Sequence, residues 1–345
     1  MNILQKFYMS VNLSRRNKRI VLIFVLLLIL IISIISGILI GAVKIGLSEL
    51  IGIIYKNDSL DPNYQILYSV RIPRVFGGML AGMSLAISGV ILQAVMNNSL
   101  AGPNIIGVNS GAGLFALIIM IVFPGYYNLV PVGAFVGALA ASLIIYTIAL
   151  KTGASRLIII LAGVAVSGLL SAGIDMLTII FPDSVIGASS FMIGGLAGIT
   201  QTEIGFALIF IVIGAMSALL LSSHLNILSL GDEIALSLGL RVKLYRFLFI
   251  ATASLLAGGA VSIVGLLGFV GLIVPHTARL IVGNDAKMLI PVSALLGGSF
   301  VILCDLLARV IFAPYEIPVG IIMSLLGGPF FIWLIIKKKR SNIYD

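Results

Sequence analysis

Long apolar runs, separated by short segments rich in glycine or charge, repeat along almost the whole chain. Most of the runs have the roughly 20 residues that a helix needs to cross a hydrocarbon core, and the alternating pattern of barrel strands is absent. The chain is therefore expected to be an all-α membrane protein with about ten transmembrane helices. The predicted spans are 20–43, 69–95, 105–123, 129–150, 157–181, 203–222, 246–264, 267–283, 289–310 and 316–336.

One apolar stretch is too long for a single crossing. From Phe247 to Ala278 the only ionisable side chain is His276. A helix of roughly 32 residues would be about 48 Å long, whereas the hydrocarbon core is about 30 Å thick. The chain is therefore expected to reverse near Gly265 to Gly268, which leaves two short spans.

Composition supports the membrane class. Of the 345 residues, 60% are hydrophobic and 10% are charged, whereas a soluble domain has about 25% charged residues. The net charge of +9 comes from basic residues that cluster beside apolar spans, which indicates membrane topology and contact with lipid rather than nucleic-acid binding. The single cysteine, Cys304, excludes an intrachain disulfide framework.

The distribution of lysine and arginine predicts the orientation in the plasma or inner membrane. Basic clusters lie from Lys6 to Arg19 and from Lys337 to Arg340. Because cations concentrate on the cytoplasmic side, both termini are expected there, with an even number of spans. The run that begins at Ile20 exceeds the apolar core of a cleaved signal peptide, about 7–15 residues, so it is expected to be a permanent span. The predicted parts are a cytoplasmic basic segment (1–19), a transmembrane domain (20–336) and a cytoplasmic basic tail (337–345).

Three arginines are expected on the outer side, against this charge rule. Arg71 and Arg74 flank Pro73 in the segment RIPR, at the mouth of an apolar run. They also lie at the N-terminal end of the coming helix, where the helix dipole favours anions. Arg309 lies at the outer end of the ninth span. These side chains are expected to project to the outer surface; the alternative is that they reach lipid headgroups or satisfy local carbonyl groups.

Two aspartates are expected inside the membrane, where a charge is costly and is therefore a candidate for function. Asp305 lies four residues before Arg309 on one helix face, so a structural ion pair is the favoured interpretation. Asp175 has no partner that the sequence reveals. An ion-coupled secondary transporter would usually display more such groups, so their scarcity weakens the hypothesis of a secondary transporter.

Two glycine-rich breaks interrupt the apolar pattern. The first, NNSLAGPNIIGVNSGAG (97–113), is polar, and non-helical backbone near a membrane is tolerated only where it is buried in protein or lines a wet cavity. Its polar side chains are therefore candidates to line a pathway. The second break, Pro182 to Thr200, is expected to hold a short outer helix. The pathway candidates are Asn97, Asn98, Asn104, Asn109 and Ser110.

The longest cytoplasmic loop, about 222–245, contains LSLGDEIALSLGLRV. The spacing of Leu230, Ile234 and Leu238 predicts a short amphipathic helix that ends at a glycine. We interpret this helix as a docking element for a cytoplasmic partner. The alternative is a helix that lies on the membrane surface.

Catalytic chemistry is not visible in the sequence. The phosphate loop GxxxxGK[ST], the zinc motif HExxH and the nucleophile elbow GxSxG are all absent. No catalytic residue and no metal-ligating cluster is therefore assigned, an intramembrane hydrolase is poorly supported, and the chain is not expected to be an enzyme.

Several segments resemble the membrane permeases of ATP-binding-cassette (ABC) importers for ferric siderophores, haem and cobalamin, the FecCD-like permeases. This resemblance implies a cobalamin-permease-like fold, that of type II ABC importers, working as a dimer with an identical or related permease subunit. It also implies two ABC ATPase subunits that use ATP and Mg, an extracytoplasmic substrate-binding protein, and no cofactor bound by this chain. Ferric siderophore is the first choice of cargo, before haem or cobalamin. The segments are RIPRVFGGMLAGMSLAISGVILQAVMNNSLAGPNIIGVNSGAG (71–113), LAGVAVSG (161–168), GDEIALSLGL (231–240), GFVGLIVPHTARLIVG (268–283) and CDLLARVIFAPYEIPVGIIMSLLGGPFFIWL (304–334).

The resemblance also assigns roles to particular residues. Glu233, Ala235 and Gly239 match the E-A-A-x-x-x-G pattern of importer coupling loops, with Ile234 in place of the first alanine. The loop KTGAS (151–155) corresponds to a cytoplasmic gate. The assigned residues are, for ATPase coupling, Gly231, Asp232, Glu233, Ala235, Leu238 and Gly239; for the gate, Thr152 and Ser155; and for docking on acidic residues of the binding protein, Arg71, Arg74 and Arg309.

Overall fold

The computed structural model describes residues 15–41, 46, 52, 53, 55, 61–152, 155–313 and 315–341. Most of the predicted N-terminal segment and the end of the predicted tail, residues 1–14 and 342–345, lie outside the described residues. The elements are α2 (Arg15–Leu39), α4 (Pro62–Gln65), the π-helical turn η1 (Ile66–Arg71), α5 (Ile72–Val95), η2 (Pro103–Ile106), α6 (Val108–Val122), η3 (Tyr127–Leu129), α7 (Val130–Lys151), α8 (Arg156–Ile180), α9 (Pro182–Ile193), α10 (Gln201–Leu220), α11 (Ser222–Ser229), α12 (Asp232–Ser237), α13 (Val242–Val264), α14 (Val270–Val282), α15 (Ala286–Val310) and α16 (Val319–Ser341).

The predicted all-helical class is confirmed, because no strand occurs in the described part of the chain. Within that part, seven helices are long and apolar enough to cross a membrane. Each of the ten predicted spans coincides with one of these helices or with one of three shorter apolar helices, Val108–Val122, Val270–Val282 and Val319–Leu334. The number of crossings and the side on which the termini lie stay predictions.

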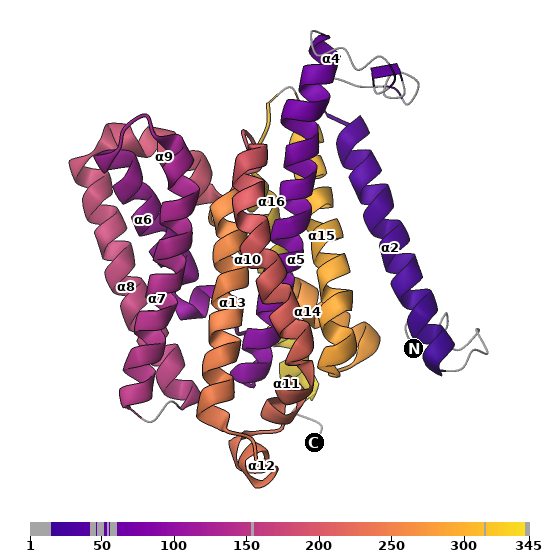
Figure 1. Cartoon of the computed structure of the whole chain (residues 1–345), viewed down its shortest axis with the longest axis vertical. Helices are drawn as coiled ribbons and strands as arrows, with labels where there is room; N and C mark the ends of the chain where they lie inside the picture. The colour runs from indigo at the N-terminus through magenta and orange to yellow at the C-terminus, as the bar shows by residue number, and fades with distance from the viewer. Residues whose placement is uncertain are drawn as a thin grey trace.

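The helices form a bundle with two distinct ends, which we call the upper and lower ends as they lie in Figure 1. The short helix α4 lies at the upper end, and α11 and α12 lie at the lower end. The first described helix, α2, begins at the lower end and leans along one side of the bundle (Figure 1).

The helix α5 forms the centre of the bundle, where glycines permit close contact with its neighbours. A Cβ atom on Gly82 would overlap the carbonyl oxygen of Gly297 on α15, and one on Gly89 would overlap the carbonyl oxygen of Gly271 on α14. Without a hydrophobic drive between helices in lipid, such contacts allow the van der Waals packing that holds them together. The packing of α5 against α14 and α15 therefore depends on small residues at these positions.

The predicted reversal between α13 and α14 is confirmed. The helix α13 ends at Val264, and the amide of Leu266 donates to the carbonyl of Phe191, 2.9 Å away, at the end of α9. The next helix, α14, leads to Asp285, which accepts a hydrogen bond of 2.9 Å from Asn226 on α11. Because α11 belongs to the lower end, α14 runs back toward the end from which α13 started.

The second glycine-rich break also folds as predicted, since it contains the 12-residue helix α9. In Figure 1 this helix lies at the upper end, beside α6 and α8. Its last residues, Met192 and Ile193, lie beside the start of α16 and beside residues 265–269 between α13 and α14, which we call the reversal segment. The end of α9, the reversal segment and the start of α16 therefore lie together at one place in the bundle.

Candidate functional site

At the upper end, five charged residues form one cluster, which we call the upper cluster: Arg71, Arg74, Asp305, Arg309 and Glu316. The Arg74 guanidinium donates from Nε to both Asp305 oxygens at 3.0 and 3.1 Å, and its Nη1 lies 2.6 Å from Glu316 Oε2. Arg309 Nε lies 3.1 Å from Asp305 Oδ2, so the predicted pair within α15 is confirmed. Asp305 therefore forms ion pairs with two arginines from two helices.

Arg71 and Arg309 bind the free end of α2. Arg71 Nη1 donates to the carbonyls of Ile38 and Leu39 at 2.7 and 3.0 Å. Arg309 donates to the carbonyls of Ile40 and Gly37, each at 3.1 Å. The last carbonyls of a helix have no intrahelical partner and lie at the negative end of its dipole. Two cations at this place therefore satisfy four acceptors and stabilise the end of α2.

The expectation that the three arginines project to the outer surface is wrong. Arg71, Arg74 and Arg309 are only 4%, 6% and 3% exposed. The alternative, satisfaction of local carbonyl groups, is confirmed for Arg71 and Arg309. The physical reason is that the end of α2 and two carboxylates lie beside the arginines and offer better partners than water or headgroups. Glu316 is the most exposed acid of the cluster, at 37% of its side chain.

The second intramembrane aspartate differs from its prediction in burial. Asp305 is buried as expected, but Asp175 is exposed on α8, five residues before the helix ends. Asp175 nevertheless lies within the apolar helix Arg156–Ile180, which is long enough to cross a membrane.

At the lower end, α12 forms the predicted helix in the long loop. Gly231, with φ of 114°, and Gly239, with φ of 80°, lie on either side of it in backbone conformations that favour glycine. The side chain of Ala235 is fully buried. Ile234, Leu236 and Leu238 are 50%, 60% and 60% exposed. The helix therefore presents an apolar surface away from the bundle.

The carboxylate of Asp232 fixes the start of α12 to two other helices. Its Oδ1 accepts from Arg156 Nη2 of α8 at 2.9 Å and from Arg246 Nη2 of α13 at 2.7 Å, and its Oδ2 accepts from Arg246 at 2.8 Å. Burial alone would raise the pKa of the Asp232 carboxyl, but the hydrogen bonds and charge of Arg246, and then of Arg156, lower it below its ordinary value. Asp232 is therefore ionised at neutral pH.

The two predicted gate residues form local hydrogen bonds at helix ends. The Thr152 hydroxyl donates to the carbonyl of Ile148 at 3.0 Å, and the Ser155 hydroxyl accepts from the amide of Ile158 at 3.3 Å. Both side chains are exposed. Residues 153 and 154 of the same loop lie outside the described residues. Thr152 and Ser155 thus cap the end of α7 and the start of α8.

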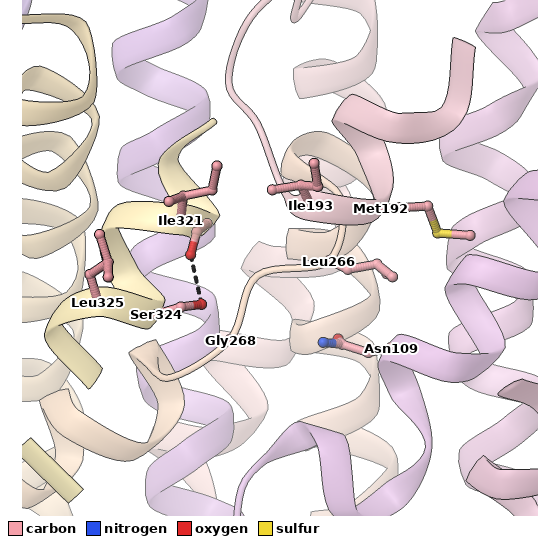
Figure 2. A pocket seen from close by; sticks show the side chains of 9 residues that line it. Asn109, Met192, Ile193, Leu266, Gly268, Ile321, Ser324 and Leu325 are labelled. Carbon is pink, nitrogen blue, oxygen red and sulfur yellow. Dashed lines mark hydrogen bonds between the residues drawn. The ribbon is translucent and has the colours of Figure 1, made fainter. Parts of the chain in front are cut away.

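An open cavity of about 640 Å³ lies beside the reversal segment (Figure 2). Asn109, from the start of α6, and Ser324, from α16, are its polar lining residues. The Ser324 hydroxyl donates to its own helix, at the carbonyl of Gly320, whereas the buried Oδ1 of Asn109 accepts no hydrogen bond from any described residue. The rest of the lining is Met192, Ile193, Leu266, Gly268, Gly320, Ile321 and Leu325.

Of the five pathway candidates, Asn109 is the one that lines this cavity. Asn97 and Asn104 are exposed, and Asn98 accepts a hydrogen bond from the amide of Leu100 at 2.9 Å within its own turn. Ser110 is half-buried beside Asn109. Sequence reasoning missed the contribution of α9 and α16, because their apolar residues carry no signal that separates a cavity wall from a core.

The comparisons with known proteins agree with this architecture. The profile of the FecCD transport family matches residues 27–337. The Fe(3+)-citrate import system permease protein YfmE of Bacillus subtilis (strain 168) is 35% identical over 336 residues, which covers 95% of this chain and 99% of that protein. The hemin transport system permease protein HmuU of Yersinia pestis is 36% identical over 337 residues, which covers 95% of this chain and 98% of that protein.

A solved structure matches over nearly the same range. It is an inward-facing conformation of a provisionally assigned metal-chelate type ABC transporter, with a TM-score of 0.79 and 30% sequence identity, and the match covers 91% of this chain and 98% of that one. Fold and sequence thus lead to the same family, as the sequence segments at 71–113 and 231–240 predict. The chain therefore belongs to the FecCD transport family and is a membrane permease of the ABC importer type.

Proposed function

We propose that this permease carries an iron(III) chelate of the siderophore type into the cytoplasm, through a pathway that it forms with a second permease subunit. Two partner ATPase subunits supply the free energy, and an extracytoplasmic binding protein delivers the cargo. The observation that carries the proposal is the surface at α12, where the apolar side chains of Ile234, Leu236 and Leu238 are exposed. The ion pair of Asp232 with the buried Arg246 fixes this helix at the lower end of the bundle.

The lower end is the ATPase-docking end in this proposal, and therefore the cytoplasmic end. Ile234, Leu236 and Leu238 lie outside the apolar spans, so lipid does not cover them in the ten-span topology. Grouped apolar side chains of this kind mark a surface for another protein. ATP binding by that partner favours one conformation of the permease only through contacts that differ between two states. Because Asp232 connects α12 to α8 and α13, such contacts have a route into the bundle.

The cavity supports an organic chelate as cargo. Its volume of about 640 Å³ lies within the range of small-molecule sites, about 300–1,000 Å³. One amide and one hydroxyl stand in a lining that is otherwise apolar or glycine. Such a lining suits a cargo whose metal is already coordinated, because it offers apolar contact surface rather than side chains that would coordinate the metal. The relatives named for ferric citrate and hemin carry metal in that form, so ferric siderophore is the first choice and haem or cobalamin follow.

The upper end is the docking surface for the binding protein in this proposal. Since Arg71, Arg74 and Arg309 are buried, they act from beneath the surface. An acidic residue of the binding protein reaches Arg74 when it displaces the exposed carboxylate of Glu316. The gate at Thr152 and Ser155 lies at the opposite, cytoplasmic end of the same pathway.

Reconstitution in proteoliposomes tests the proposal. The complex of permease, ATPase subunits and binding protein is supplied with radiolabelled iron as a ferric hydroxamate, ferric citrate or haem, with and without ATP inside. We expect uptake of the ferric hydroxamate that requires both ATP and the binding protein and that ionophores leave unchanged. Uptake that proceeds without ATP and collapses with the ion gradient would establish a secondary transporter instead.

A further inference from the structure

Three helices begin around one carboxylate at the lower end. Asp232 is the first residue of α12, Arg156 is the first residue of α8, and Arg246 lies in the second turn of α13. Both arginines donate to Asp232 Oδ1, at 2.9 and 2.7 Å, and Arg246 also donates to Oδ2 at 2.8 Å. The mutual position of these three helix starts therefore depends on a single side chain.

The charges explain why the carboxylate is needed. A cation at a helix N-terminus is unfavourable, because the dipole places positive charge there already. Arg156 lies at such an end, and Arg156 and Arg246 would repel each other without an anion between them. Asp232 supplies that anion, and its own place in the first turn of α12 is favourable.

The two connections of Asp232 differ in strength. Arg246 is buried and binds both carboxylate oxygens, so this connection fixes α12 to α13. Arg156 makes one hydrogen bond to Asp232 and is partly exposed. Both hydrogen bonds of Arg246 come from one nitrogen, Nη2, and the Arg246 side chain is 3% exposed, against 22% for Arg156. Water and salt therefore weaken the pair with Arg156 more than the pair with Arg246. The connection to α8 is therefore the one that yields first when α12 moves.

The helix α8 leads from this connection to the cavity. A Cβ atom on Gly163 would overlap the carbonyl oxygen of Ile105 in η2, so the two backbones are in direct contact. One turn further, Ser167 approaches Gly107, which directly precedes α6. Asn109, two residues later, lines the cavity. A displacement of α8 at Arg156 therefore reaches the cavity wall through packed backbone rather than through a mobile loop.

We propose that Asp232 and Arg156 are positioning residues for transport, and that their ion pair transmits movement of α12 to α8 and so to the cavity. Arg246 serves as the fixed point on α13. The inference rests on the proposed function, because it takes α12 as the surface on which the ATPase acts. It adds the residues that connect this surface to the pathway.

Measurement of ATP hydrolysis and cargo uptake in the same proteoliposomes tests the inference. The variants are Arg156→Gln, Arg156→Lys, Asp232→Asn and, as a matched control, Lys243→Gln, which removes an exposed cation of α13. We expect Arg156→Gln to keep the ATPase subunits bound and to hydrolyse ATP, while uptake per ATP falls about tenfold or more, the scale of one charged hydrogen bond. Arg156→Lys restores most of the ratio, and Lys243→Gln matches the wild type.

A double variant strengthens the test. If the pair acts as one unit, Asp232→Asn with Arg156→Gln has the same uptake per ATP as Asp232→Asn alone. An unchanged ratio in Arg156→Gln overturns the inference, and so does an equal loss of uptake and hydrolysis, which would indicate a structural role only. Absence of ATP-dependent uptake in the wild-type complex refutes the proposed function itself, so the two failures are distinguishable.

Discussion

The upper cluster makes a sharp prediction about stability, because its two carboxylates differ in burial. Asp305 is buried between Arg74 and Arg309, whereas Glu316 is partly exposed and forms its ion pair with Arg74. The substitutions Asp305→Asn and Glu316→Gln remove one charge each and preserve the size of the side chain. The first leaves two buried arginines without their shared counterion, and the second leaves the pair of Arg74 with Asp305 intact.

The expected magnitudes follow from burial. Removal of one partner of a buried ion pair costs about 3–5 kcal/mol, because the remaining charge stays buried without compensation. An exposed pair contributes about 0–1 kcal/mol. An unfolding entropy of about 2.1 cal/mol/K per residue for 345 residues converts these values to a fall in Tm of about 4–7 °C for Asp305→Asn and less than about 2 °C for Glu316→Gln.

Thermal unfolding of the purified permease in one detergent measures both variants beside the wild type. The retention of a monodisperse peak in size-exclusion chromatography after heating gives the Tm. Salt should change the result for Glu316→Gln more than for Asp305→Asn, because exposed charges are screened and buried ones are not. Equal Tm values for the two variants would refute the assignment of Asp305 as the shared counterion of the cluster.

Three further predictions concern docking and packing. Glu316→Gln is expected to tighten binding of the binding protein at low salt, measured by surface plasmon resonance, because it removes the carboxylate that occupies Arg74; weaker binding would contradict this. Leu236→Glu is expected to abolish co-purification of the ATPase subunits, whereas Leu280→Ala, at an exposed leucine of α14, should not. Gly89→Leu is expected to prevent folding, because its side chain would overlap the α14 backbone, while Gly205→Ala, with open space around it, should express normally.

Arginines at helix ends recur at both ends of the molecule, with opposite electrostatics. At the upper end, Arg71 and Arg309 meet the negative end of α2, so the dipole itself stabilises them. At the lower end, Arg156 lies at the positive end of α8, and it shares Asp232 as counterion with Arg246. The upper arrangement therefore gains from the helix dipole itself, whereas the lower one depends on a single carboxylate.

The sequence alone was sufficient for features that depend on local order. The length and composition of apolar runs predicted the positions of the helices, because a span must satisfy its own backbone within one continuous segment. The excess length from Phe247 to Ala278 predicted the reversal after Val264. The pair of Asp305 and Arg309 followed from a spacing of four residues, since one helix fixes that distance before any packing.

Tertiary structure alone decided which groups meet across helices. Arg74 pairs with Asp305, 231 residues away, and Arg71 binds carbonyls of α2, more than 30 residues before it. A topology rule counts the charges on each side of a membrane, but it does not say which acceptors the packing places beside them. Asn109 lines a cavity for the same reason, because α9, α16 and the reversal segment converge on it only in the folded bundle.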